Sequence, residues 1–169
     1  MVLDKHPSII LVDRELLEIS NTSFSDCVLH TLLLAETVSN IVIRDSLFTN
    51  NSAESAGLTF LGSTVEMTRV EWNSNQVRSN TASFGWFGEE SYLTIDDFLA
   101  VNNYGYLGGV LYLELVECTI SNSLFQMNSA GGSGGALYLA QEARVSLYND
   151  TVRLSRLSVE VVVLTEETV

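Results

Sequence analysis

The sequence has little proline and few residues of the kinds that bind metals or polyanions. Of its 169 residues, one is Pro, two are Cys and two are His, and eight Lys and Arg stand against 21 Asp and Glu. Affinity for nucleic acid comes chiefly from neutralising phosphates, so the formal net charge of −13 argues against nucleic acid and anionic membrane surfaces as partners. A cation or a basic partner is compatible with this charge.

Long apolar runs are also missing. No stretch approaches the roughly 18 apolar residues of a transmembrane helix, and residues 1–7 lack the layout of a signal peptide. Two interpretations stay open. Either the protein stays inside the cell, or the chain is a fragment of a longer exported protein, in which case we expect an extracellular or cell-surface location.

What the sequence does contain is a repeat of 24 to 28 residues. A typical copy has two aliphatic residues spaced by two. A large apolar residue follows five positions after the second aliphatic residue, and Asn follows eight positions after that same aliphatic residue. The second aliphatic residue stands at 19, 43, 67, 95, 120 and, in a decayed copy, 147. A period of this length indicates units that stack on one another.

The pattern inside each copy predicts strands. Polar residues separate the paired aliphatic residues, which is the alternation of a strand with one buried face. A second apolar segment with Gly at its entry follows, as in Gly108 to Tyr112 and Gly134 to Tyr138. We therefore predict an all-β parallel β-helix (solenoid) of about six coils, with a third short strand around Phe48 and its equivalents. Its one domain comprises an N-terminal cap (1–15), the repeats (16–158) and a C-terminal strand and tail (159–169).

Stacked coils bring equivalent residues together in columns. We expect Asn51, Asn75, Asn103 and Asn128 to form a structural ladder whose amides hydrogen-bond along the axis. Asn also tolerates the left-handed conformation that such corners need, and we expect the Gly residues to serve the next corner. Four coil steps place Cys27 and Cys118 about 19 Å apart, too far for an intramolecular disulfide.

Candidate catalytic and metal-binding groups are few. The pair Asp96 and Asp97 is the best candidate, because glycoside hydrolysis uses two carboxylates. In the repeat frame, however, Asp45, Arg69 and Asp97 share a column of alternating sign, which predicts a solvated charge ladder. The two Cys and two His have no metal-ligand spacing. We predict no catalytic residue, no metal and no cofactor.

The third repeat carries additional residues between Asn75 and Gly85. Solenoids often place insertions on a binding face, so a possible contact site comprises Gln76, Arg78, Asn80, Trp86 and Phe87. The alternative is a tolerated surface loop. Tyr112 and Tyr138 share an outward position, where an aromatic stack either binds sugars or a partner chain or stabilises the coils themselves.

Two motifs carry a resemblance to a known family. Phe48-x-x-Asn51 and Phe125-x-x-Asn128 are full copies of F-x-x-N, and residues 134–137 are a full copy of G-G-A-[ILV]. They resemble the repeats of the chlamydial polymorphic outer-membrane proteins, also seen in protist surface proteins, over roughly residues 16 to 155. The resemblance implies a right-handed parallel β-helix, surface display and adhesion. Trp72, Ala100 and Cys27 depart from the motif.

We accordingly predict a non-enzymatic structural or interaction module for surface adhesion or assembly. Its protein or carbohydrate partner would bind the lateral face or the coil ends, with end-to-end or larger assembly possible. Neither Ser8 to Val12 nor the apolar Val159 to Leu164 resembles a polar capping repeat. The alternatives are a carbohydrate-active β-helix enzyme, lyase, hydrolase or esterase, and an accessory subunit of a large complex.

Overall fold

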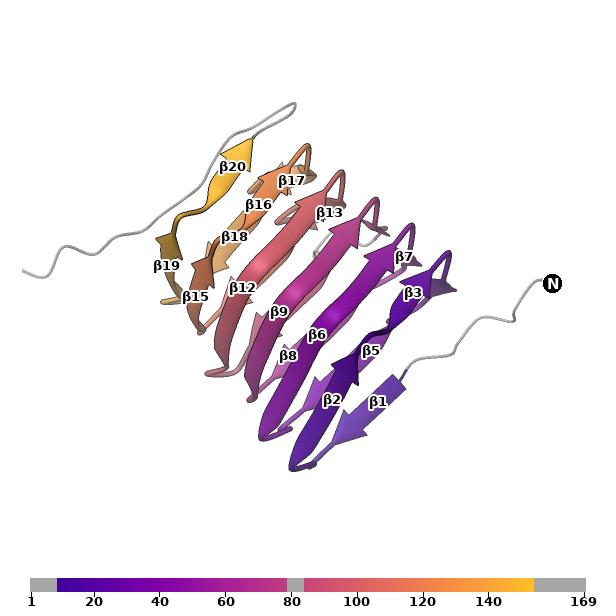
Figure 1. Ribbon diagram of the computed structural model, residues 1–169, viewed down its shortest axis with the longest axis vertical. Helices are drawn as coiled ribbons and strands as arrows, with labels where there is room; N and C mark the ends of the chain where they lie inside the picture. The colour runs from indigo at the N-terminus through magenta and orange to yellow at the C-terminus, as the bar shows by residue number, and fades with distance from the viewer. Residues whose placement is uncertain (1–8, 79–83, 154–169) are drawn as a thin grey trace, which may run out of the picture.

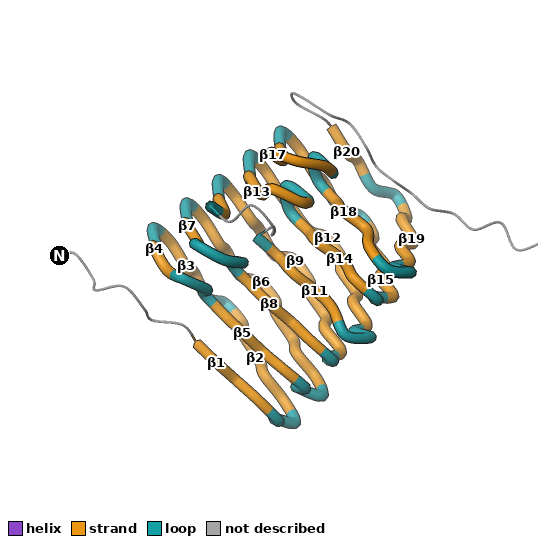
Figure 2. The backbone as a smooth tube through the Cα atoms, turned by 180° about the vertical axis from the view of Figure 1, so that it is seen from behind, coloured by secondary structure: helices purple, strands orange, loops and turns teal. Residues whose placement is uncertain are grey.

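The chain winds into a right-handed parallel β-helix of about five turns. A computed structural model describes residues 9–78 and 84–153, and within these ranges every regular element is a β-strand. The strands form three parallel sheets, which we call A, B and C (Figures 1 and 2). Two of the faces stack six coils each, as the repeat predicts.

The strand bounds follow the three faces of the coils. Sheet A contains β1 (Ile9–Val12), β5 (Leu33–Glu36), β8 (Leu58–Leu61), β11 (Gly85–Gly88), β14 (Leu111–Glu114) and β18 (Leu137–Ala140). Sheet B contains β2 (Leu16–Ser20), β3 (Ser23–Ser25), β6 (Asn40–Thr49), β9 (Thr64–Asn73), β12 (Tyr92–Val101), β15 (Glu117–Ser121), β16 (Leu124–Gln126), β19 (Arg144–Tyr148) and β20 (Thr151–Arg153). Sheet C contains β4 (Val28–Leu29), β7 (Ser52–Ala53), β10 (Gln76–Val77), β13 (Tyr104–Leu107) and β17 (Ser129–Ser133).

The coils pair in the register that the repeat predicts. Ile43 lies beside Met67, and Met67 beside Ile95, so like positions stack on like positions. The third strand differs from the prediction. Phe48 belongs to the same long strand as Ile43, and the third sheet begins only after the ladder Asn. The strand bends instead at Asp45, whose positive φ of 50° turns the chain without breaking the sheet.

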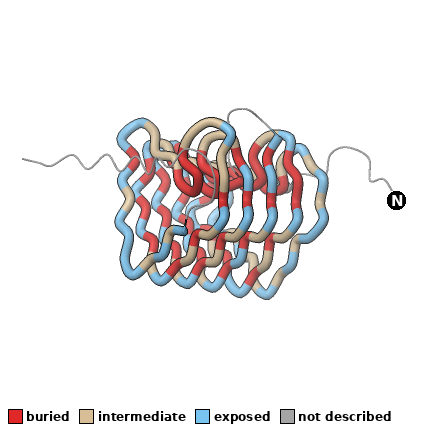
Figure 3. Tube along the Cα trace, turned by 90° about the horizontal axis from the view of Figure 1, so that it is seen from above, coloured by how far each residue is buried: buried red, intermediate tan, exposed pale blue. Residues whose placement is uncertain are grey.

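Inward-facing side chains fill the coils. Figure 3 shows buried residues alternating with exposed ones along the trace, as expected for strands with one buried face. The largest side chains in this core are aromatic and fully buried, and they are Trp72, Phe48, Phe60, Phe84, Phe87, Phe98 and Phe125. Several of these rings pack on one another, and Trp72 lies edge-on against Phe84 and Phe98 at centroid distances of 5.2 and 5.1 Å.

The ends of the solenoid are placed only in part. β1 supplies the expected first strand within residues 1–15, whereas the strand and tail predicted at 159–169 lie outside the described residues. Nothing helical in the described ranges has the length and apolar character needed to cross a membrane.

Candidate functional site

The predicted asparagine ladder is present and is fully hydrogen-bonded at its centre. The Nδ2 of Asn75 donates to the Phe48 carbonyl at 2.8 Å and to Asn103 Oδ1 at 3.0 Å. Its Oδ1 accepts from both the backbone N–H and the Nδ2 of Asn51, at 3.1 and 3.0 Å. Asn103 repeats the arrangement with Asn128. The amides of Asn51, Asn75 and Asn103 thus each tie three coils together, and the four ladder residues are at most 3% exposed.

The left-handed backbone conformation that was expected of the ladder residues is found instead at the residue before each of them. Positive φ angles occur at Asn50, Ser74, Asn102 and Met127, and not at the ladder Asn that follows each of them. The expectation was wrong because a left-handed residue just before the corner turns the next side chain inward. The ladder Asn is therefore selected for its amide rather than for its backbone.

Cys27 occupies the first rung of the ladder and leaves it incomplete. Its backbone N–H donates to Asn51 Oδ1 at 3.1 Å, but a thiol cannot supply the second amide donor that Asn51 and Asn75 supply in the next coils. Both cysteines are free thiols, as predicted. Burial raises the pKa of Cys27, with a further contribution from the Asp26 carboxylate, and burial raises the pKa of Cys118 far above its usual range.

We expect Cys27→Asn to stabilise the protein by about 1 kcal/mol, because the new amide adds a hydrogen bond to Asn51 Oδ1. Urea unfolding followed by tryptophan fluorescence measures this gain. Cys27→Ser is the matched control, since a hydroxyl is too short to reach the ladder. Equal stability of the two variants would contradict the assignment.

Charged side chains on the outer face of sheet B pair between coils. Arg69 donates to both oxygens of Asp45, at 2.6 and 3.0 Å, which lowers the pKa of that carboxyl. Asp96 accepts from Asn122 at 2.8 Å and Ser121 at 2.7 Å, and these bonds lower its pKa. The Asp45–Arg69 rung of the predicted charge ladder is therefore present, while Asp96 lies in the next column and bonds to the neighbouring coil there.

Further polar columns escaped the sequence analysis. At one corner the Val38 N–H donates to Ser63 Oγ and the Ser63 N–H to Ser91 Oγ, both at 3.2 Å. At another corner the backbone N–H groups of Thr22 and Phe98 donate to hydroxyls one coil further on, which belong to Ser46 and Ser123. The signal was a recurring Ser at fixed spacing, which is weak because other coils carry Val or Phe there.

The structure separates the residues of the predicted contact site. Gln76 and Arg78 are exposed at sheet C, and Gln76 pairs in register with Ser52, so it belongs to the regular coil rather than to the insertion. Asn80 lies outside the described residues. Phe87 was wrongly included, because β11 turns it into the core, where it is fully buried against Phe60. Trp86 is half-buried on the outer face of sheet A.

An aromatic column extends from Trp86 across that outer face. Trp86 meets Tyr112 edge-on at 5.7 Å, and the rings of Tyr112 and Tyr138 stack at 5.4 Å with an interplanar angle of 18°. The stacked faces contact each other and so are not free to receive a sugar ring. This geometry supports the interpretation that the tyrosines stabilise neighbouring coils. Burial, followed by the Glu114 carboxylate, raises the pKa of Tyr112.

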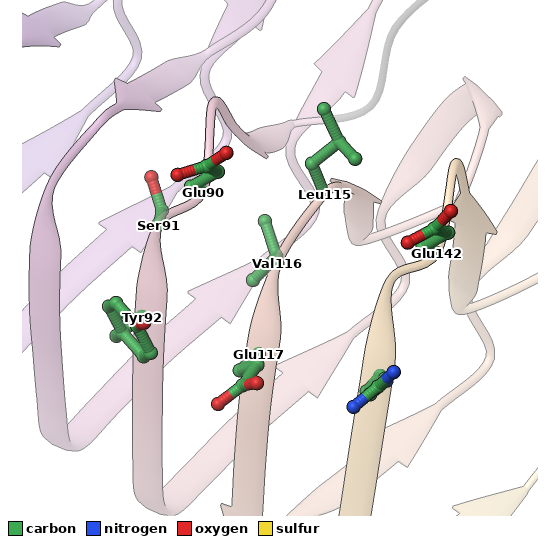
Figure 4. A pocket seen from close by; sticks show the side chains of 8 residues that line it. Glu90, Ser91, Tyr92, Leu115, Val116, Glu117 and Glu142 are labelled. Carbon is green, nitrogen blue, oxygen red and sulfur yellow. The ribbon is translucent and has the colours of Figure 1, made fainter.

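A lateral groove lies where sheets A and B meet in the last three coils (Figure 4). It has a volume of about 260 Å³, and its lining residues are Glu90, Ser91, Tyr92, Leu115, Val116, Glu117, Glu142 and Arg144. Tyr92 and Leu115 are large apolar side chains that stay 56% and 40% exposed. Three glutamates from three successive coils line the same groove, with Arg144 as the lining residue of opposite charge.

Sequence reasoning missed this groove because its residues are not part of the repeated phrase. Glu90, Leu115 and Glu142 occupy a corner at which each has a positive φ, and the corner residues differ in type from coil to coil. The usable signal was Leu115 itself, a large apolar residue just outside a strand.

Metal-binding clusters of three or more His, Cys, Asp or Glu are absent from the part of the chain that the structure describes. In comparisons with known proteins, no family model, curated protein or solved structure matches the chain.

Proposed function

We propose that the chain is a non-enzymatic interaction module, a rigid solenoid that presents a protein-binding groove on its side. The exposed pair Tyr92 and Leu115 inside the groove carries this proposal. Large exposed apolar side chains that share one concavity are the usual anchors of a protein interface.

The polar contacts of the solenoid support a structural role for the rest of its surface. Acidic side chains on this surface bond to residues of neighbouring coils. Examples are Asp45 with Arg69 and Asp96 with Asn122. In several other pairs, too, a residue of the later coil donates to a residue of the earlier one. These pairs are Asn50 with Asp26, Thr37 with Asp13, Gln141 with Glu114 and Asn149 with Asn122. These contacts hold neighbouring coils together, and none of them involves a lining residue of the groove. The one between Gln141 and Glu114 lies at its border, and Tyr92 and Leu115 stay exposed there.

The partner that fits the groove is a protein segment with basic and apolar residues. Glu90, Glu117 and Glu142 give the rim an excess of negative charge, and the whole chain carries −13. Complementary charge would speed encounter and orient the segment, while Tyr92 and Leu115 would supply most of the contact energy. The F-x-x-N and G-G-A-[ILV] phrases further suggest that this binding serves surface adhesion.

Selection of binders from a random peptide library displayed on phage tests this proposal. We expect enriched peptides to combine Arg or Lys with apolar residues, and Tyr92→Ser to weaken their binding at least about tenfold, or 1.4 kcal/mol. Tyr104→Ser is the matched control, because Tyr104 is 43% exposed on sheet C, away from the groove. Peptides that are not basic, or that bind both variants equally, would refute the proposal.

The three glutamates favour one second candidate, a carbohydrate-active enzyme, since acidic side chains from successive coils converge in one groove. All three are exposed, whereas a general acid is normally set in an apolar pocket. Product release from pectin, alginate and neutral polysaccharides tests this candidate. Turnover that Glu117→Gln abolishes would establish it, and no turnover on the panel would favour the binding module.

A further inference from the structure

Among the residues that the structure describes, the core of the solenoid is incompletely covered at the first coil. In the second coil Ile41, Ile43 and Phe48 are at most 1% exposed, but the residues in the same columns one coil earlier are only partly buried. These are Leu17, Ile19 and Phe24. Beside them, Leu16 and Val28 are 60% and 65% exposed, the highest values among the large apolar side chains that the structure describes.

The last described coil is incompletely covered in the same way. Val145 and Val152 are partly buried, and Leu147 is 41% exposed although its column neighbour Ile120 is fully buried. Within the described ranges, β2 and β19 are the two ends of the long sheet, so each has one edge without a paired strand. They lie at opposite ends of the molecule (Figure 1). Open sheet edges of this kind template further strands.

The two ends match in length and in backbone shape. β2 and β19 each have five residues, β3 and β20 each have three, and β1 and β18 each have four. The bend between β2 and β3 falls at Asn21, and the bend between β19 and β20 falls at Asn149, with φ of 50° and 56°. A first coil placed beyond a last coil therefore continues all of these strands in register and with the same polarity.

The side-chain columns continue as well. Ile19 of the added copy would cover Leu147, as Leu147 covers Ile120 within the chain. Thr22 of the added copy would place its hydroxyl one coil beyond Asp150. In the interior, Ser123 lies one coil beyond Phe98 and its hydroxyl accepts from the Phe98 N–H, and Asp150 in turn accepts from the Ser123 N–H. The acidic Asp26 would lie near the basic Arg153.

We infer that copies of this chain associate end to end, the last coil of one copy packing on the first coil of the next. The inference rests on the fold and does not depend on the proposed groove. The contact joins two different surfaces in the same direction each time, so it produces open fibres rather than closed rings. Because each copy carries −13, salt should strengthen the association by screening repulsion.

Site-directed cross-linking tests the contact directly. Inside the chain Asn149 Nδ2 donates to Asn122 Oδ1 at 2.8 Å, and the junction gives Asn21 of the next copy the same relation to Asn149. In the full chain with Cys27→Ser, the variant Asn21→Cys with Asn149→Cys should oxidise to dimers, trimers and longer ladders on non-reducing gels. Asn102→Cys replaces Asn21→Cys in the control, because Asn102 is also exposed with a positive φ but lies in an interior coil. Equal ladders from both pairs, or none, would overturn the inference.

Light scattering after size exclusion provides a second readout. The mean mass should rise above the monomer's 18.6 kDa with protein concentration and with salt. We expect Leu147→Lys to weaken association at least about tenfold, because it places an unpaired charge in the junction. Tyr104→Lys, at a residue of sheet C that is 43% exposed against 41% for Leu147, should leave it unchanged. A monomeric mass at every concentration and salt level, as expected if another segment covers the last coil, would refute the contact.

Discussion

Asn75→Ala is expected to destabilise the protein by about 4 kcal/mol. The substitution removes four buried hydrogen bonds at once, with Phe48, Asn51 and Asn103 as the partner residues. A typical bond contributes about 1 kcal/mol, and each buried group left without a partner costs about 1 to 3 kcal/mol. Urea unfolding followed by tryptophan fluorescence gives the change in free energy of unfolding.

Two further variants sharpen this test. Asn40→Ala, at an exposed position in β6, should change stability by less than about 0.5 kcal/mol. Asn75→Asp keeps the shape but gives two acceptors, Phe48 O and Asn103 Oδ1, a carboxylate in place of a donor. Its folded pKa should be raised, so its stability should fall as the pH rises above 4. If Asn75→Ala lowers the free energy of unfolding no more than Asn40→Ala does, the ladder does not stabilise the fold.

The second large effect is a rescue between Gly85 and Trp72. Gly85 interrupts a column of sheet A that begins with Ile9 and otherwise contains leucine, namely Leu33, Leu58, Leu111 and Leu137. A Cβ at Gly85 would lie 2.6 Å from Cη2 of Trp72, so the indole fills the space that a leucine would take. Trp72 in turn stands where the neighbouring coil has Phe48. The small residue at Gly85 and the large residue at Trp72 therefore compensate for each other in volume.

Gly85→Leu alone should destabilise by about 3 kcal/mol through overpacking. Trp72→Phe alone should cost only about 1 kcal/mol, because the lost packing is offset by removal of a buried Nε1 that has no hydrogen-bond partner. The double variant should be within about 1 kcal/mol of the parent protein, giving a coupling of roughly 3 kcal/mol.

Combining Gly85→Leu with Phe60→Leu provides the control for this cycle. Phe60 is equally buried, but the atoms nearest to a new Cβ at Gly85 belong to Trp72 and Leu111. Its effect should add to that of Gly85→Leu without rescue. An additive result for Trp72 as well would show that the indole does not fill the missing leucine's space.

The repeat predicted the stack and the ladder because residues at a constant spacing must meet when coils pair in register. Phe87 shows that more was available from the same columns. Trp86 aligns with Tyr112 and Tyr138, already predicted to face outward, so its neighbour in β11 had to face inward. The adjacent aromatics Trp86 and Phe87 should therefore not both have been assigned to a surface.

Other features depend on contacts that no column of the sequence displays. Trp72 and Gly85 lie on different faces of the coil, so their compensation appears only when the faces close around the core. The groove depends on corners whose residues change in type from coil to coil while their φ stays positive, as at Glu90 and Leu115. Backbone conformation recurs there without a recurring residue, and periodicity cannot detect it.

In-register stacking of the coils is the claim on which the ladder, the groove and the end-to-end contact all depend. Glu18 and Ser146 are exposed positions in one column of sheet B, five coil steps apart. Spin labels there, in a sample diluted with unlabelled chain and with Cys27→Ser, should give one narrow distance distribution by pulsed electron resonance. At about 4.8 Å per step the backbones should lie roughly 24 Å apart. A broad distribution, or one centred well beyond about 35 Å, would contradict the stacked coils.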